Sequence, residues 1–226
     1  MNQPDNTPLL RAQTPGATVK IAPLTPHHAR QAAQLHIAGQ PGTFLTSLGL
    51  EVLTIFYAAL PSSPVGFGYV IPTAMGEEIA GFVSATTSTG RLFAELGIRH
   101  LGRFLPPLLR RFARQPQLAW RSAQTLLYPL AAGGHGEQTG APTAELLSIM
   151  VEPAQRSHGL GAQLLDALCL ECERRSIVQI DVTVDATNAG ARRFYARHGF
   201  VEMRPFQLYG RAMCSYRRTL ARGCAR

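Results

Sequence analysis

A chain of 226 residues, 46% of them hydrophobic, has the size and apolar content of one ordinary domain with a substantial core, which excludes a wholly disordered protein. Four cysteines are too few for a disulfide scaffold. The longest apolar stretch, around residues 55–71, is interrupted by prolines and serines, which argues against a membrane-spanning helix. The N-terminus lacks the basic and apolar regions of a signal peptide, so we expect a cytoplasmic protein.

The net charge of +8 is concentrated in one segment. Between Arg91 and Arg121 there are seven arginines and one acidic residue, Glu95, so this segment carries +6 of the total. A basic patch attracts nucleic acid, anionic lipid or a phosphorylated ligand. A solvated helix face is the simpler interpretation, because the chain is rich in arginine and has a single lysine, Lys20. We therefore expect no nucleic-acid partner, and membrane contact by these helices stays an alternative.

The first residues, 1–17, are polar and rich in proline and threonine, which indicates a flexible tail. A short strand is predicted over residues 18–22. Thr25 followed by Pro26 is typical of a helix start, because threonine caps the first amides and proline is accepted at the first helical position. This helix is expected to end at Gly39.

A second helix is predicted over residues 48–60, with Ser47 as its N-cap and a broad apolar face. Two strands are predicted after it, over residues 65–71 and 79–86, joined by a turn at 74–77.

The arginine-rich segment, residues 90–130, is expected to be a helical insertion. Its apolar residues recur at helical spacing: Leu101, Phe104, Leu105, Leu108, Leu109 and Phe112. Pro106 and Pro107 lack the amide hydrogens that a helix interior requires, so we expect one helix on each side of this pair. A third helix is predicted over about 117–128, followed by a glycine-rich loop over 131–143.

The pattern changes at residue 144 to an alternation of strands and helices. The predicted elements are a strand over 145–151, a helix over 159–174, a strand over 178–185, a short helix over 188–198, and a hairpin of strands over 204–208 and 212–219. Apolar and polar residues alternate strictly in the strand over 178–185, as expected where one face is buried. The class is therefore mixed α/β, with one domain over 18–220 and a short tail over 221–226.

A glycine-containing turn, Arg156 to Gly161, lies between a predicted strand and a predicted helix. The first turn of a helix has free amide groups and the positive end of the dipole, and glycines let a phosphate approach the backbone closely. The turn is neither a P-loop nor a dinucleotide-binding fingerprint. Taken alone it is a weak signal, since a strand-to-helix turn that binds nothing has the same composition.

The surrounding sequence gives this turn its context. The run AELLSIMVEPAQRSHGLGAQLLDAL followed by TVDATNAGARRFYARHGF resembles motifs A and B of the GNAT superfamily of N-acetyltransferases. The resemblance is firm over about 144–200, extends more loosely over 18–86 and 201–220, and fails over about 90–140. It implies a mixed, mostly antiparallel twisted sheet whose central strands splay apart, flanked by helices.

The resemblance also implies acetyl-CoA as co-substrate, with its pantetheine arm between the splayed strands. The backbone of Ile149, Met150 and Val151 would contact this arm, and Asn188 would hydrogen-bond it, a role compatible with a simpler one as helix N-cap. The pyrophosphate would rest on the amides of the following turn: Arg156, Ser157, His158, Gly159, Leu160, Gly161 and Ala162. We expect no metal site, because Cys169 and Cys172 lie within a predicted helix without a second ligand pair.

Two catalytic residues are implied by the resemblance. Tyr195 stands where many family members place the acid that protonates the departing thiolate, the alternative being a core aromatic beside Phe194. Glu145, which precedes Gly159 by 14 residues as in the histone-acetylating branch, is the candidate base. A partly buried carboxylate there would have a raised pKa and could relay a proton through water, whereas ordered water alone or a surface charge are the alternatives. The amide of Met150 or Val151 would bind the oxyanion.

Strand periodicity places Glu145 and Leu147 on one face, and Leu146 and Ser148 on the other. The resemblance also implies that the acceptor meets the thioester between the first two helices and the strands opposite, where Phe44, Leu45, Phe56 and Tyr57 would line it. The arginine-rich insertion is then a lid, a clamp for an anionic acceptor, or core.

The resulting hypothesis is an N-acetyltransferase that moves an acetyl group from acetyl-CoA to a primary amine of a small molecule, by direct attack through a tetrahedral intermediate. A protein or peptide N-acetyltransferase is the first alternative, and it would need an open groove. The second alternative is a non-catalytic acyl-CoA-binding or membrane-surface protein, whose arginine helices bind anionic lipid. Both a monomer and a homodimer are compatible with the sequence.

Overall fold

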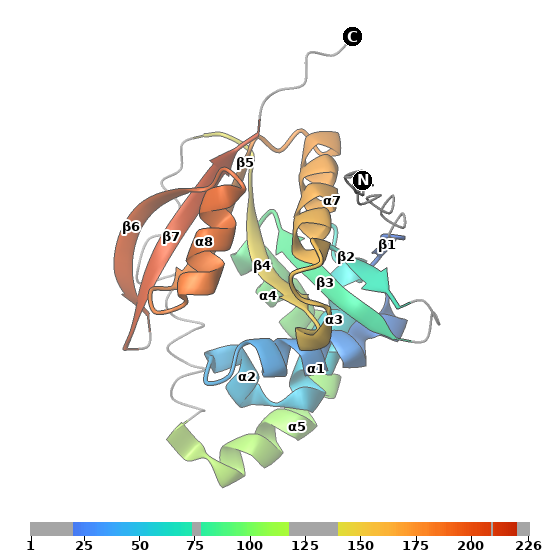
Figure 1. Cartoon of the computed structure of the whole chain (residues 1–226). Coiled ribbons are helices and arrows are strands. Elements are labelled where there is room, and N and C mark those ends of the chain that lie inside the picture. Colours follow the sequence, from blue (N-terminus) through green and yellow to red (C-terminus); the bar gives the residue numbers. More distant parts are fainter. Residues whose placement is uncertain (1–19, 74–77, 118–139, 209, 221–226) are drawn as a thin grey trace, which may run out of the picture.

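The centre of the molecule is a seven-stranded sheet in the order β1-β2-β3-β4-β5-β7-β6 (Figure 1). The computed structural model describes residues 20–73, 78–117, 140–208 and 210–220. The strands are β1 (Ala22–Pro23), β2 (Gly66–Pro72), β3 (Ile79–Thr86), β4 (Thr143–Val151), β5 (Gln179–Asp185), β6 (Val201–Leu208) and β7 (Arg211–Thr219). Neighbouring strands are antiparallel except β4 and β5, which are parallel. The expected mixed α/β fold with a mostly antiparallel sheet is confirmed.

Helices cover both faces of this sheet. They are α1 (Ala29–Gly39), α2 (Phe44–Leu48), α3 (Leu50–Ala59), α4 (Thr89–Arg99), α5 (Leu101–Arg114), α7 (Leu160–Arg174) and α8 (Ala189–Arg197). Side chains of β3 alternate between two core clusters: Val83 and Ala85 face the cluster that contains α7 and α8, and Phe82 faces the cluster that contains α1, α3 and α4. In Figure 1, α7 and α8 lie in front of the sheet and α4 lies behind it.

Most predicted elements have an observed counterpart. The six strands predicted after residue 64 correspond to β2–β7, and the two helices predicted after residue 158 correspond to α7 and α8. The burial of β5 alternates as predicted. The turn at 74–77, the tails, and most of both the third insertion helix and the glycine-rich loop lie outside the described residues.

The N-terminal helices depart from the prediction in one place. α1 follows Thr25 as predicted, through a short 3-10 turn. The second predicted helix is divided into α2 and α3 by Gly49, whose φ of 91° lies in the left-handed region that favours glycine. Thr43 caps α2 by accepting a hydrogen bond from the amide of Thr46 at 3.3 Å. Ser47 lies inside α2, so its prediction as the N-cap was wrong.

The proline pair does not divide the insertion as predicted. Pro106 and Pro107 lie inside a single helix, α5. They deprive the carbonyls of Gly102 and Arg103 of their helical donors, which costs a helix interior about 3 kcal/mol. Gly102 and Arg103 are exposed, so water can satisfy these carbonyls, and the prolines come only one turn after the helix begins. The prediction of two separate helices was therefore wrong.

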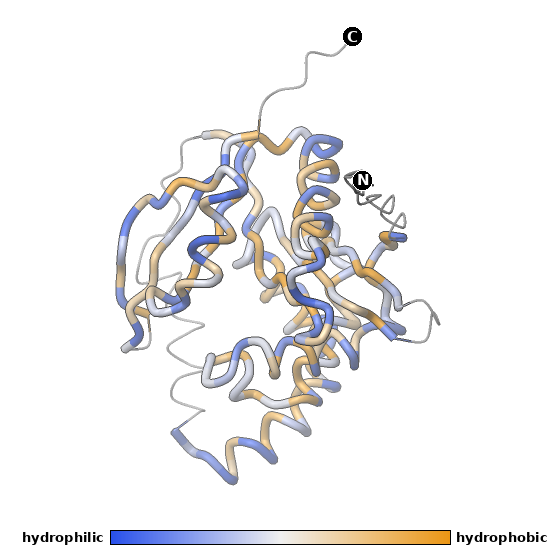
Figure 2. The backbone as a smooth tube through the Cα atoms, in the orientation of Figure 1, coloured by the Kyte–Doolittle hydropathy of each residue, from blue (hydrophilic) through white to orange (hydrophobic). Residues whose placement is uncertain are grey.

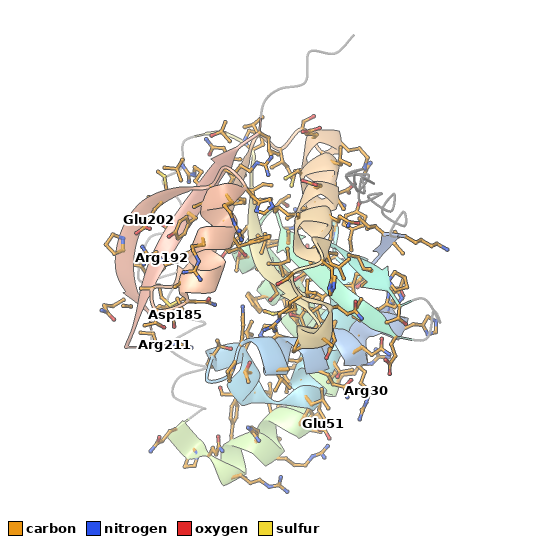
Figure 3. The ribbon with its side chains drawn as sticks, viewed as in Figure 1. Arg30, Glu51, Asp185, Arg192, Glu202 and Arg211 are labelled. Atoms are coloured by element: carbon orange, nitrogen blue, oxygen red, sulfur yellow. The ribbon has the colours of Figure 1, made fainter. Side chains whose placement is uncertain are left out.

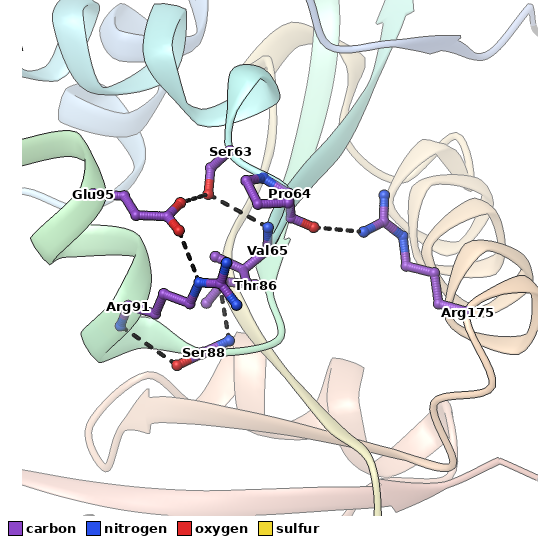
Figure 4. Close-up of polar contacts among 8 residues, drawn as sticks. All are labelled: Ser63, Pro64, Val65, Thr86, Ser88, Arg91, Glu95 and Arg175. Atoms are coloured by element: carbon purple, nitrogen blue, oxygen red, sulfur yellow. Dashed lines mark hydrogen bonds and ion pairs between the residues drawn. The ribbon is translucent and has the colours of Figure 1, made fainter. Parts of the chain in front are cut away.

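Polar contacts and apolar packing both fasten α4 to the domain (Figure 4). Leu92 and Leu96 are buried in the core cluster of α1 and α3. The Glu95 carboxylate accepts hydrogen bonds from Ser63 Oγ at 2.8 Å and from Arg91 Nε at 2.7 Å. Ser88 caps the helix by accepting from the Arg91 amide at 3.4 Å. The beginning of the insertion is thus part of the core, as one of the three interpretations expected.

An extra residue in β4 changes which side chains share a face. Ser84 of β3 is opposite Ser148, but the next residue of β3, Ala85, is opposite Leu146, so Leu147 forms a β-bulge. Leu146 consequently faces the core cluster of α7, whereas Ser148 contacts α1 and α3 on the other face. The prediction that Leu146 and Ser148 share a face was wrong because strict alternation does not survive a bulge.

A buried polar cluster lies at this bulge. His36 Nδ1 is 2.6 Å from the Tyr57 hydroxyl and 3.2 Å from Ser148 Oγ, and Ser148 donates to the Leu147 carbonyl at 2.7 Å. All three side chains are almost fully buried. Among the described residues His36 Nε2 has no hydrogen-bond partner, and burial lowers the pKa of His36 to about 4. The imidazole is therefore neutral at physiological pH.

This burial predicts a pH-dependent loss of stability. The folded-state pKa of His36 lies below the ordinary value of 6.5, so the unfolded chain binds more protons and stability falls as pH decreases from 6.5 towards 4. The difference of 2.5 units corresponds to about 3 kcal/mol at its limit. Urea unfolding of wild type and His36→Asn between pH 7 and about pH 4 measures this contribution, since asparagine does not titrate. Parallel pH profiles of the two proteins would contradict the prediction.

Candidate active site

β4 and β5 pair over only part of their length. Their parallel ladder joins Thr143–Leu146 to Gln179–Val182. Beyond it, β4 continues to Val151 along β3, while β5 continues along β7. We call the diverging ends of β4 and β5, residues 147–151 and 183–185, the fork. The expected separation of the central strands is thus present.

Main-chain groups of β4 alternate between β3 and the open side of the fork. The Glu152 amide donates to the Ala80 carbonyl at 2.8 Å, and in an antiparallel ladder every second residue points the same way. Met150, opposite Phe82, therefore directs its amide and carbonyl towards β3. Those of Ile149 and Val151 face the fork, and the side chain of Arg156 reaches the Val151 carbonyl at 3.2 Å.

The fork leads directly into the glycine turn. After Val151 a short 3-10 turn precedes Arg156, and residues 156–159 are exposed before α7 begins at Leu160. The amides of Leu160, Gly161 and Ala162 lie in the first turn of this helix, where the helix itself supplies no acceptors. With the helix dipole and the Arg156 guanidinium beside them, they form a place where an anion is stabilised.

The two glycines of the turn serve different purposes. Gly159, the N-cap of α7, has a φ of 78°, in the left-handed region that favours glycine. A Cβ added there would meet no neighbouring atom, so the backbone conformation and not close packing requires glycine. A Cβ added to Gly161 would lie 3.3 Å from the Phe194 ring, so this glycine lets α7 and α8 pack closely. Only Gly159 is thus needed for the conformation of the turn itself.

Asn188 is the N-cap of α8, as one interpretation expected. Its Oδ1 accepts a hydrogen bond from the Ala191 amide at 3.0 Å, and the residue is exposed. This bond uses the oxygen of the side-chain amide and orients the Nδ2 group as a donor.

Tyr195 lies on α8 with its ring in the core. Its centroid is 5.3 Å from that of Phe194 and 5.2 Å from that of Phe200, both in edge-to-face geometry. The side chain is 5% exposed, and burial raises the pKa of the Tyr195 hydroxyl above its ordinary value. The phenol is therefore protonated across the physiological range, which suits a proton donor and also a core aromatic.

Glu145 lies in the paired part of β4, opposite Thr86 on one side and Asp181 on the other. Thr89, the first residue of α4, donates a hydrogen bond from its hydroxyl to the Glu145 carboxylate. Burial raises the pKa of the Glu145 carboxyl, the Thr89 bond opposes this, and the charge of Asp181 raises it further. About 10–13 Å of strand separates Glu145 from Ile149, so a proton would reach it through water.

Arg211, which the sequence reasoning missed, connects two distant parts of the chain. It forms an ion pair with Asp185 at 2.5 Å and donates to the Gly42 carbonyl at 3.2 Å (Figure 3). β7, the end of β5 and the loop between α1 and α2 are thereby joined. Its signal in the sequence was only the hairpin position beside Gly210, which carries no information about a partner 169 residues away.

The expected acceptor residues separate into two groups. Phe56 and Tyr57 are buried in the core and do not line an accessible surface. Phe44 and Leu45 of α2 are partly exposed, on the segment that follows Gly42. The expectation was thus wrong for Phe56 and Tyr57, because the dense apolar face of α3 packs on the sheet.

Two other features lie outside this site. A shallow depression of about 370 Å³ between α8 and β6 is lined in part by Arg192, Glu202 and Tyr216. Arg192 and Glu202 form an ion pair at 3.0 Å (Figure 3). The Tyr216 hydroxyl donates to Glu202 at 2.6 Å and accepts from Arg192, so all three side chains have a structural role. In the part of the chain that the structure describes, no group of three or more His, Cys, Asp or Glu side chains is placed to hold a metal ion.

The site is built on the segment that comparison with known proteins identifies. The model of the acetyltransferase (GNAT) family matches residues 112–200, which include β4, α7, β5 and α8. This segment is therefore similar to acetyltransferases of the GNAT family. The resemblance of its motifs to this superfamily is therefore confirmed.

Solved structures share the GNAT fold with this chain at low sequence identity. A GNAT-family protein from Desulfovibrio desulfuricans has a TM-score of 0.57 and 15% identity, covering 90% of this chain and 99% of its own. Ard1 from Thermoplasma volcanium has a TM-score of 0.57 and 13% identity, with coverage of 91% and 99%. NAA60 from Arabidopsis thaliana, in complex with acetyl-CoA, has a TM-score of 0.56 and 15% identity, with coverage of 90% and 99%.

One curated relative matches a shorter stretch. Mycothiol acetyltransferase of Streptosporangium roseum is 35% identical over 68 residues, which are 30% of this chain and 19% of that relative. The chain thus matches about a fifth of the length of this relative. Among the described helices, none is both long and apolar enough to cross a membrane.

The contact between Thr89 and Glu145 makes a testable prediction. The Thr89 hydroxyl stabilises the charged carboxylate, so Thr89→Ala is expected to raise the pKa of Glu145 further. An NMR titration that follows the Glu145 carboxyl carbon measures this shift. Thr187→Ala is the matched control, since its hydroxyl bonds to Asp185 instead. An unchanged or lowered pKa in Thr89→Ala would show that the contact does not govern this carboxyl.

Proposed function

We propose that the protein is an acetyl-CoA-dependent N-acetyltransferase that acts on a primary amine of a small molecule. The observation that carries the proposal is the continuity of the fork with the glycine turn. Main-chain groups of Ile149 and Val151 face the fork, and the chain then passes into exposed helix-start amides beside Arg156. An extended arm with amide groups and a pyrophosphate at one end is complementary to such a surface.

The cofactor would bind as an added strand along β4. Its pantetheine amides would pair with Ile149 and Val151. Met150 would not contact it directly, because its main chain is engaged with β3 and its side chain is buried in the core cluster of α1 and α3. The pyrophosphate would rest on the amides of residues 156–162, so that Ser157 and His158 act through their backbone. Asn188 would donate its Nδ2 group to the same arm.

The reaction would proceed by direct attack. A neutral amine forms a nitrogen–carbon bond with the thioester carbonyl, and the resulting oxyanion accepts a hydrogen bond from the Ile149 or Val151 amide. The amine proton passes through water to Glu145, whose raised pKa suits a base at neutral pH. The carbon–sulfur bond then breaks, and the thiolate takes its proton from Tyr195, yielding an amide and CoA.

The contacts of Arg211 favour a small acceptor over a polypeptide. In the family the acceptor enters between the first two helices and the strands opposite them. Here Arg211 spans that approach, from Asp185 to the Gly42 carbonyl. A polypeptide needs an open groove, and this contact narrows the approach.

Calorimetric titration with acetyl-CoA tests the cofactor site. We expect saturable one-site binding by wild type, weakened about tenfold or more in Arg156→Glu, because a charge-assisted contact to phosphate is lost. Arg30→Glu, which makes the same charge change at an exposed position of α1, is the control. Absence of binding by folded wild-type protein would refute the proposal, and equal weakening in both variants would refute the role of the turn.

A second experiment tests the class of acceptor. Arg211→Ser removes both contacts across the approach, so acetylation of peptide amines is expected to rise several-fold relative to acetylation of small amines. CoA release measured on a matched panel of small amines and peptides gives this ratio, with Arg197→Ser as a control on α8. A wild type that prefers peptides would instead support the polypeptide alternative.

A further inference from the structure

The outer surface of α5 carries a stripe of exposed leucines. Leu101, Leu105 and Leu109 are 58%, 46% and 56% exposed, and their spacing of four residues places them on one side of the helix. Ile98, near the end of α4, is 80% exposed one turn earlier. Four large apolar side chains are therefore exposed to water along α5 and the end of α4.

A basic stripe runs along the opposite flank of the same helix. Arg103, Arg110 and Arg114 are exposed and lie about 160° around the axis from the leucines. The outermost side of α5, between the leucines and the arginines, has only residues without long polar side chains: Gly102, Pro106 and Ala113. A helix with this outer side can approach a flat surface closely, with leucines on one edge and arginines on the other.

The inner side of α5 determines this orientation. Phe104 packs against the core cluster of α1 and α3, and Arg111 Nε donates to the Ser47 carbonyl at 2.9 Å. Figure 2 shows the mixture of apolar and polar residues along α5, at the periphery of the domain. Since one side is fixed to α2 and α3, both stripes stay directed outwards.

The charge of this region selects the kind of partner. Residues 96–117 contain five arginines and no acidic residue. Within the described part of the chain, α5 makes one ion pair, between Arg110 and Glu51 at 3.7 Å, and both side chains are exposed. Glu51 offsets at most one of the five arginine charges, so the surface around the leucines is positive.

We propose that α5 binds the surface of an anionic lipid membrane. Leucines alone would fit a second copy of the chain, and arginines alone would fit a nucleic acid. Together on the outer side of one helix of low net hydrophobicity, they match the boundary between anionic headgroups and acyl chains. This surface is distinct from the fork and the glycine turn, so the proposal is independent of acetyl transfer.

Vesicle sedimentation of the full chain tests this proposal. We expect the protein to sediment with phosphatidylglycerol-containing vesicles and far less with phosphatidylcholine alone, and the binding to weaken at high salt. Each arginine near an anionic surface strengthens partition by about fivefold, so Arg103→Gln combined with Arg114→Gln should weaken it about 25-fold. Leu105→Ser combined with Leu109→Ser should also weaken vesicle binding, and it should abolish the binding that remains at high salt, since that part depends on burial of the leucines.

Matched controls separate this result from nonspecific adsorption. Leu170→Ser, at a 66% exposed leucine of α7, and Arg30→Gln, on α1, should leave partition unchanged. Equal binding to both vesicle types, or equal loss in the controls, would overturn the proposal. So would a dimer that Leu105→Ser dissociates and that ignores vesicles, or binding to duplex DNA that depends on the arginines but not on the leucines. Calorimetry with acetyl-CoA, run on the same variants, should be unchanged.

Discussion

The site depends on where β4 stops pairing with β5. The parallel ladder ends at Leu146 and Val182, and the next residue of β4, Leu147, is the bulge against β3. A bulge bends and twists its strand, so the two strands diverge at the point where the extra residue is inserted. From there the alternation of main-chain groups leaves Ile149 and Val151 facing the fork. The buried cluster of His36, Tyr57 and Ser148 supports this arrangement, since Ser148 donates to the Leu147 carbonyl.

Local patterns predicted the secondary structure around the proposed cofactor site well. The strict alternation of β5, the N-cap at Asn188 and the helix start at Gly159 each depend on neighbouring residues, and each was recognised from sequence. The faces of Leu146 and Ser148 were not, because the bulge between them arises from register with β3, some sixty residues earlier. The pairing of distant segments determines such registers, so the local alternation of apolar and polar residues cannot predict them.

The proline pair shows that a local rule can also predict a break that the structure does not have. Proline in a helix interior removes a donor and crowds the preceding turn, and this correctly predicts a cost. The cost depends on whether the released carbonyls are buried, and those of Gly102 and Arg103 belong to exposed residues. Exposure depends on tertiary structure. The sequence alone therefore predicted two helices where the structure has one, α5. Similarly, core packing was one of three interpretations of the insertion, yet the apolar stripe of α5 is covered only on its inner side, by α3.

The two sides of the proposed site therefore come from different parts of the sequence. The family match, residues 112–200, contains β4, the glycine turn and α8, which form the proposed cofactor side. The proposed acceptor side lies at α1, α2 and β7, outside that match. Its segment Gly42–Leu48 is held at one end by Arg211 and near the other by Arg111 of the insertion. Since α5 contacts α2 directly, any partner that binds the outer side of α5 also lies next to the acceptor approach.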